Sequence, residues 1–142
     1  MKLGIIGKGV VGTAIKKGFE KIKHSVSYHD IKHDTKIEDV LDTEIIYVCV
    51  GTPSNEHESC DITAVLSVVS QLNDLKYNGI VCIKSTVEPG TTQELVDKYS
   101  DLTFAFVPEF LRERCAYDDF VYNNSILVVG TESEEVYKKI VE

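Results

Sequence analysis

The sequence predicts a single α/β domain: a doubly wound, mainly parallel six-stranded sheet with helices on both faces. Short apolar segments alternate with helix-like segments along the chain, and parallel strands need crossovers that are usually helical. The run Ile45–Val50 is apolar throughout, as expected for a strand that is buried on both faces. At 142 residues and 43% hydrophobic content, the chain is long enough for one well-buried core and too short for two ordinary domains.

The elements are expected at regular places along the chain. The segments with strand character are Leu3–Ile6, Ser25–Tyr28, Ile45–Val50, Ile80–Ile83, Thr103–Val107 and Ile126–Val129. The segments with helical character are Val10–Ile22, Ile62–Leu75, Thr91–Tyr99 and Ser133–Val141. Asp61 is a suitable N-cap for the second helix. In the last two helices the residues expected to face the core are Leu95, Val96, Val136, Ile140 and Val141.

Charge and hydropathy exclude two classes of partner. The chain has 15 Lys and Arg against 23 Asp and Glu, a net charge of −8, so a nucleic acid or an anionic membrane surface would be repelled. No apolar run approaches the roughly 20 residues of a membrane helix. The first residues enter a strand pattern without the apolar region of a signal peptide, so we expect a soluble, cytoplasmic protein with no membrane partner.

The four cysteines are expected to be free thiols. No C-x-x-C spacing occurs among Cys49, Cys60, Cys82 and Cys115. Cys49 and Cys82 lie within apolar runs and resemble small buried hydrophobes, whereas the more polar surroundings of Cys60 and Cys115 leave some reactivity open. The histidines have no metal-ligand spacing, and no metal site is expected; they are His24, His29, His33 and His57.

A glycine-rich loop directly follows the first strand and opens a helix. Its residues are Gly7, Lys8, Gly9, Val10, Val11 and Gly12, and this context distinguishes a G-x-G-x-x-G loop from a chance match. Gly7 permits the tight turn, Gly9 lets the backbone approach a phosphate, and Gly12 lets the helix pack close to the strand. The helix N-terminus then faces the pyrophosphate with the favourable end of its dipole. The loop therefore predicts a Rossmann-type dinucleotide site that all six residues line.

Asp30, at the end of the second strand, is the expected partner of the adenosine ribose. It lies about 20 residues beyond the glycine loop, where an acid typically hydrogen-bonds the ribose hydroxyls. A carboxylate there favours NAD, because it repels the 2′-phosphate of NADP, although Lys32 and His33 nearby leave NADP open. A solvated turn acid and a plain tight turn are the alternatives, and the combination of loop and acid in position favours the cofactor.

Four further segments carry a family resemblance. They are Val48–Pro53 (VCVGTP), Lys84–Thr92 (KSTVEPGTT), Pro108–Glu113 (PEFLRE) and Ile126–Gly130 (ILVVG). With the glycine loop they resemble the N-terminal NAD-binding domain of the UDP-glucose/GDP-mannose dehydrogenase family, of which UDP-glucose 6-dehydrogenase is a member, over roughly Met1–Gly130. The KSTV-x-PGT and PEFLRE segments are the specific part of this resemblance.

The resemblance implies roles for residues at the carboxyl edge of the sheet, where ligands of open α/β sheets bind. Thr52 and Thr86 would contact the cofactor, and Thr86 would also organise a water near the reacting carbon. Glu109 would assist proton transfer and thioester hydrolysis, and Glu113 would lie beside the cofactor. The nucleotide-sugar side would be lined, partly through backbone contacts, by Glu109, Phe110, Leu111 and Arg112.

Each of these residues also has an ordinary structural interpretation. Ser85 and Thr86 could cap or turn the chain, and Glu109 could be an acid at a helix N-terminus. Lys84 is expected to be a surface charge at a strand end rather than a base.

The resemblance also implies parts that these residues do not contain. The family oxidises an alcohol to an acid through a cysteine in a GFGGxC segment, and it has a central helix and a C-terminal nucleotide-binding domain. Arg114 replaces the family's usual glycine, and Asn123–Ser125 replaces its Pro-x-Arg. We therefore expect a chain that is inactive alone and whose reaction is completed by the missing cysteine-bearing domain; the partners left open are a separate C-terminal half and a second copy of the chain in a homo-oligomer. A stand-alone module that binds NAD or a nucleotide sugar is the alternative; intact glycines argue against a ligand-free interaction protein.

Overall fold

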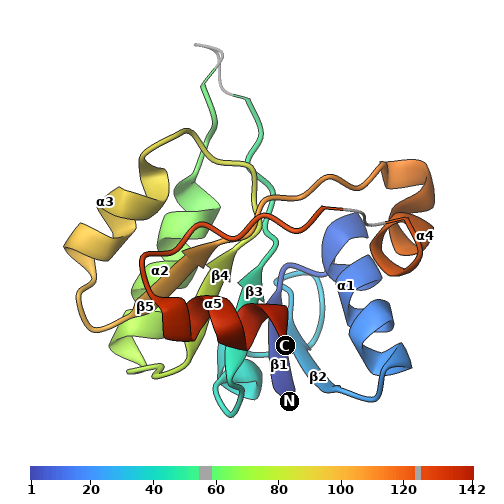
Figure 1. Cartoon of the computed structure of the whole chain (residues 1–142). Helices are drawn as coiled ribbons and strands as arrows, with labels where there is room; N and C mark the ends of the chain where they lie inside the picture. The colour runs from blue at the N-terminus through green and yellow to red at the C-terminus, as the bar shows by residue number, and fades with distance from the viewer. Residues whose placement is uncertain (55–58, 124–125) are drawn as a thin grey trace.

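The computed structural model describes residues 1–54, 59–123 and 126–142, so His57, Asn124 and Ser125 lie outside the described residues. Within these ranges, five parallel strands form one sheet in the order β2-β1-β3-β4-β5 (Figure 1). The strands are β1 (Lys2–Ile6), β2 (Ser25–His29), β3 (Ile45–Val48), β4 (Ile80–Ile83) and β5 (Thr103–Phe106). The chain passes from β1 to β2 on one side and then to β3 on the other. This reversal creates the crevice in which ligands of such sheets bind.

Helices cover both faces of the sheet. They are α1 (Val10–Lys21), α2 (Thr63–Asp74), α3 (Thr91–Lys98), α4 (Ala116–Val121) and α5 (Glu134–Val141), with the 3₁₀ turns η1 (Ile37–Val40) and η2 (Glu113–Cys115). Ile15 of α1 and Ile140 of α5 pack on one face with Tyr47. Val69 of α2 and Leu95 of α3 pack on the other. Figure 1 shows α5 crossing the front of the sheet, with α2 behind it.

All four predicted helices are confirmed to within one residue at each end. The capping at α2 differs from the prediction: Ile62 is the N-cap, and Asp61 instead accepts a hydrogen bond from the Thr63 N–H at 2.9 Å. The prediction that Val96 and Val141 face the core is wrong, because these residues are 40% and 45% exposed. Each follows a buried residue and lies about 100° further around the helix, which here places it on the solvent side.

The prediction of a sixth strand is wrong: the sheet of the described residues has five strands. The segment Ile126–Val129 does not pair as a strand; among the described residues, an antiparallel bridge forms only just beyond it, between Gly130 and Phe106. Ile126, Leu127 and Val128 are exposed by 64%, 52% and 42%. An apolar run predicts burial but does not specify the strand with which it would pair.

Two further observations concern the cysteines and the helices. All four cysteines are free. None of the helices in the described ranges combines the length and the apolar character needed to cross a membrane.

Candidate functional site

The glycine loop is built by backbone contacts that exclude side chains at two of its three glycines. Gly7 has a φ of +92°, and an added Cβ would lie 2.8 Å from backbone atoms of Cys49 and Val50. At Gly12 an added Cβ would lie 2.1 Å from the Gly7 carbonyl oxygen. At Gly9, by contrast, an added Cβ would meet no described atom within 4 Å. Fold geometry therefore explains Gly7 and Gly12 and leaves Gly9 facing open space.

The start of α1 opens into a surface hollow beside this loop. Gly9 is the N-cap and has no side chain with which to cap the helix, so the first N–H groups are available to an anion. The hollow has a volume of about 510 Å³ and is lined by the loop residues Lys8 to Val10, by Lys17, and by Glu113 to Asp118. The structure thus brings Glu113 to the loop from a segment a hundred residues later in the chain.

Asp30 closes the other side of the loop. Its Oδ2 accepts a hydrogen bond from the Lys8 N–H at 2.7 Å, and its Oδ1 accepts one from the Lys32 N–H at 2.8 Å. Burial alone would raise the pKa of Asp30, but the Lys32 and Lys8 hydrogen bonds outweigh it, and the pKa lies below its ordinary value. Asp30 is therefore a fixed anion beside the loop.

Thr52 and Thr86 come together where β3 and β4 end. The Thr52 hydroxyl donates a hydrogen bond to the Thr86 carbonyl oxygen at 2.6 Å. Ser85 is buried and donates to the Val50 carbonyl oxygen at 2.7 Å. These bonds hold the segments after β3 and β4 together at the carboxyl edge of the sheet, where Thr86 remains exposed.

Glu109 is held in a buried ion pair. Its Oε1 accepts hydrogen bonds from the N–H groups of Phe110 and Leu111 at 2.8 and 3.1 Å. Its Oε2 is buried and accepts no hydrogen bond from the described residues. The Lys84 ammonium group lies 3.0 Å from Oε2 and forms an ion pair with it. The expectation of a surface charge at Lys84 is wrong, because this residue is 7% exposed. Glu109 lies before η2 rather than inside a helix.

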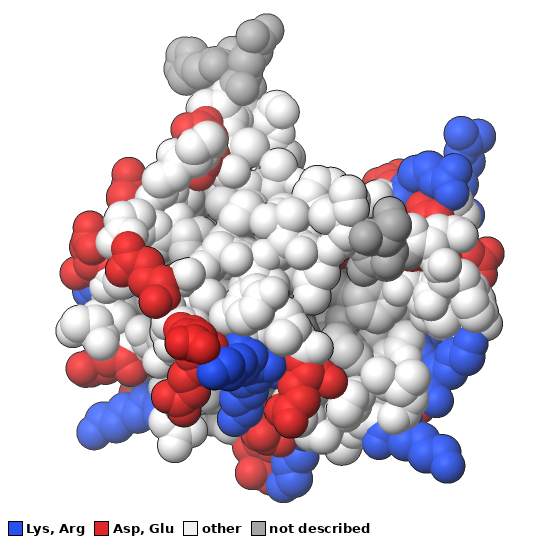
Figure 2. Space-filling view, in the orientation of Figure 1, with Lys and Arg blue, Asp and Glu red and all other residues white. Residues whose placement is uncertain are grey.

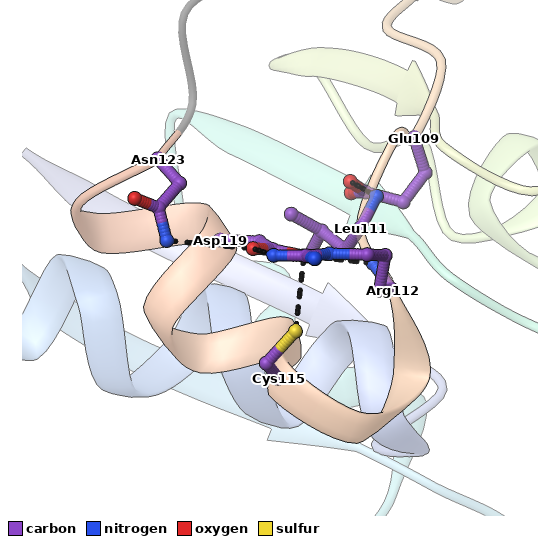
Figure 3. A network of polar contacts seen from close by, with 6 residues as sticks. All are labelled: Glu109, Leu111, Arg112, Cys115, Asp119 and Asn123. Atoms are coloured by element: carbon purple, nitrogen blue, oxygen red, sulfur yellow. Dashed lines mark hydrogen bonds and ion pairs between the residues drawn. The ribbon is translucent and has the colours of Figure 1, made fainter.

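The Arg112 side chain, expected on the substrate side, is held by Asp119 of α4 (Figure 3). Its guanidinium donates to both carboxylate oxygens at 2.9 and 2.7 Å, and the Arg112 N–H donates to Oδ2 at 3.0 Å. These bonds hold the pKa of Asp119 well below its ordinary value despite burial. The contact fixes the backbone between Leu111 and α4. Phe110 remains 63% exposed.

Three cysteines have environments that favour the neutral thiol. Burial raises the pKa of Cys49 and of Cys82 to about 12. Burial and a hydrogen bond donated to Asp119 also raise the pKa of Cys115. A nucleophilic cysteine needs the opposite shift, so none of these three is an activated nucleophile.

An apolar cavity of about 250 Å³ reaches the Lys84–Glu109 pair from the α1 and α5 side. Its lining includes Phe19, Phe120 and Leu127. Figure 2 shows that the centre of the face carrying α5 has few charges, and that charged side chains gather around its rim. Sequence reasoning missed this cavity and the roles of Lys84 and Asp119. Strand alternation was the available signal for Lys84, since it lies two residues beyond the buried Cys82.

In the part of the chain that the structure describes, no three His, Cys, Asp or Glu side chains gather as a metal site would require. The fold and the loop together define a dinucleotide-binding domain of the dehydrogenase class.

Sequence comparison identifies the family within this class. Residues 31–142 match the UDP-glucose/GDP-mannose dehydrogenase family, NAD binding domain. The UDP-glucose 6-dehydrogenase AglM of Haloferax volcanii is 28% identical over 188 residues, which cover 100% of this chain and 44% of that protein. The UDP-glucose 6-dehydrogenase of Rickettsia felis is 30% identical over 149 residues, which cover 99% of this chain and 33% of that protein. The chain belongs to this family and is its NAD-binding domain.

Solved structures share the fold. A UDP-glucose dehydrogenase from Pyrobaculum islandicum superposes with a TM-score of 0.86 at 23% identity, over 99% of this chain and 43% of that chain. A GDP-mannose dehydrogenase from Pseudomonas aeruginosa superposes with a TM-score of 0.85 at 22% identity, with the same coverage. The chain spans less than half the length of these relatives. The family match begins at Ile31, so the assignment of the glycine loop rests on its geometry and on the relatives that align over the whole chain.

Proposed function

We propose that the chain binds NAD with the pyrophosphate against Gly7–Gly12 and the adenosine ribose on Asp30, as the cofactor half of a nucleotide-sugar dehydrogenase. The observation that carries this proposal is the contrast among the three glycines. Gly7 and Gly12 are required by backbone contacts, whereas Gly9 faces open space at the start of α1. A glycine that the fold does not require, at a helix N-terminus, is best explained by a phosphate that approaches the backbone.

The preference for NAD follows from the charge of Asp30. Two backbone N–H groups hold its carboxylate as an anion, and this anion would repel a 2′-phosphate while accepting hydrogen bonds from ribose hydroxyls. Lys32 and His33 are the groups that would counter this preference.

The catalytic part of the proposal concerns Thr86 and Glu109. Bound NAD supplies the hydride acceptor. The exposed Thr86 hydroxyl is suited to orienting a water, and the Glu109 carboxylate to accepting a proton. Glu113 is assigned to the cofactor side. Phe110, Leu111 and the Arg112 backbone are assigned to a nucleotide sugar, UDP-glucose or a relative.

We assign the step that needs a cysteine thiolate to another polypeptide. The family's chemistry needs a thiolate, and Cys49, Cys82 and Cys115 favour the thiol form. A separate cysteine-bearing half is therefore the proposed partner for turnover; a homo-oligomer would carry the same cysteines and is proposed only as an assembly state. A stand-alone module that binds NAD or a nucleotide sugar without turnover is the second candidate, favoured by the same thiol environments.

Calorimetric titration tests the cofactor assignment. We expect NAD to bind more tightly than NADP, and Asp30→Ala to weaken NAD binding by about tenfold or more, the range for a charged hydrogen bond. Asp34→Ala, an exposed acid in the same loop, is the matched control and should leave the affinity unchanged. Tighter binding of NADP, or an unchanged affinity in Asp30→Ala, would contradict the ribose assignment.

A further inference from the structure

A lysine and a glutamate are directed to the same place by two neighbouring strands. Cys82 of β4 pairs in register with Ala105 of β5, and both belong to the core on the α1 and α5 side of the sheet. Side chains alternate along a strand, so residues two positions apart share a face. Lys84 continues the face of Cys82, and Glu109 continues the face of Ala105 beyond the strand end. The sheet register therefore brings the two charges together.

The backbone that carries Lys84 is anchored. Its N–H donates to the Val48 carbonyl oxygen at 2.9 Å, and the Ser85 N–H donates to the same oxygen at 3.1 Å. The Lys84 side chain is 7% exposed. A lysine is almost never this buried unless it is paired, and Glu109 is the ionic partner recorded for it.

The two carboxylate oxygens of Glu109 have different partners. Oε1 accepts the Phe110 and Leu111 N–H groups, and Oε2 faces the Lys84 ammonium group. Without the ammonium group, Oε2 would be a buried charge with no partner among the described residues. Such a charge is strongly unfavourable, so the carboxylate would turn towards water and release the two N–H groups.

We infer that Lys84 is the positioning residue for Glu109: the ammonium group holds the carboxylate in the orientation that caps the Phe110 and Leu111 N–H groups at the edge of the site. The role in catalysis rests on the function proposed for Glu109, whereas the positioning itself does not. Lys84 is assigned no contact with substrate or cofactor. Its effect passes through Glu109 to the segment proposed to line the nucleotide-sugar side.

Amide hydrogen exchange measured by NMR on the chain without NAD tests this inference. In Lys84→Met we expect the Phe110 and Leu111 amides to exchange at least about tenfold faster, as expected when a hydrogen bond to a charged group is lost. Lys84→Arg should restore slow exchange, because it restores the cation. Lys2→Met removes an exposed ion pair with Asp42 and should leave both amides unchanged. Unchanged exchange in Lys84→Met would overturn the inference.

A double-mutant cycle keeps the test decisive if Lys84→Met alone does not fold. Glu109→Gln removes the charge but keeps an oxygen acceptor, and Lys84→Met/Glu109→Gln removes both members of the pair. Lys84→Met should have no further effect on the two amides in the Glu109→Gln background. A full effect in that background would show that Lys84 acts through general packing and would overturn the inference.

The same samples separate this inference from the proposed function. NAD binding with unchanged amide exchange in Lys84→Met would reject the positioning role and keep the cofactor assignment. Accelerated exchange in a chain that does not bind NAD would support the positioning role and reject the cofactor assignment.

Discussion

At the scale of single residues, Gly9 is a glycine that the proposed ligand requires and the fold does not. Its backbone has a φ of −74° as the N-cap of α1, a conformation that any residue adopts, and the space around it is open. Asparagine is among the best N-cap residues because its side chain accepts a helix N–H. Stability and cofactor binding should therefore respond to substitution at this position in opposite directions.

We predict that Gly9→Asn keeps or slightly raises the Tm and weakens NAD binding by about a hundredfold or more, because the side chain occupies the approach to the backbone. Thermal unfolding and calorimetry on the same sample measure the two effects. Gly12→Ala is the contrasting variant, since its Cβ would meet the Gly7 carbonyl oxygen. It should lower stability by about 1–3 kcal/mol. Wild-type NAD affinity in Gly9→Asn would mean that phosphate does not bind at this loop.

At the scale of elements, the bond between Arg112 and Asp119 explains how a short helix is held at the edge of the site. α4 has six residues, too few for independent stability. Asp119 accepts bonds from the Arg112 backbone and guanidinium and contacts Cys115 and Asn123 (Figure 3). A single carboxylate thus joins the segment after β5 to both ends of α4.

We predict that Asp119→Asn lowers the Tm at neutral pH by about 2–5 °C, because the Arg112 side chain is largely exposed and its pairing is screened by solvent, and removes part of the acid sensitivity of the protein. The folded-state pKa of Asp119 lies well below the ordinary 3.8, so the unfolded chain takes up the proton first as the pH falls. The stabilisation is therefore complete above about pH 5 and is lost progressively below it. Chemical unfolding between neutral pH and about pH 3 measures this slope.

Asp118→Asn, the exposed neighbour, is the control and should keep the wild-type acid slope. An acid slope in Asp119→Asn equal to that of the wild type would show that another carboxylate governs acid unfolding.

The elements also show which features sequence patterns can predict. Helices of eight residues or more have an apolar periodicity, and all four were predicted within a residue at each end. α4 is too short for such a pattern and was missed. The sixth strand was wrong because pairing depends on a partner that the run Ile126–Val129 does not specify. Lys84 was misjudged because charge at a strand end usually indicates solvent, whereas its burial depends on Glu109, 25 positions away.

At the scale of the whole molecule, the strand order assembles a site from segments distant in sequence. The loop after β1 lies against the backbone after β3, the segment after β3 bonds to that after β4, and the one after β5 pairs with Lys84. The carboxyl edge could be predicted as the place where these groups meet, since parallel strands end together. The individual bonds could not, because they depend on register and side-chain reach.

Three of the four cysteines are poorly suited to supply the thiolate that the proposed chemistry needs. Covalent catalysis needs an activated nucleophile at the reacting carbon, and the thiols of Cys49, Cys82 and Cys115 all have raised pKa values. The carboxylate of Glu109 and the hydroxyl of Thr86 can handle water and protons but cannot form the covalent intermediate. Binding without turnover is the expected behaviour of these 142 residues.

We predict that the purified chain with NAD and UDP-glucose forms no NADH above background, and that a separately expressed cysteine-bearing C-terminal half restores turnover. NADH absorbance with a panel of nucleotide sugars measures this, before and after mixing. In the restored system, Thr86→Ala and Glu109→Ala should each lower the rate by about a hundredfold, the usual range for general acid–base groups, while Cys115→Ser should leave it unchanged. Steady formation of the uronic acid by the chain alone would contradict the prediction, and Cys60→Ser would then identify whether the remaining thiol is responsible.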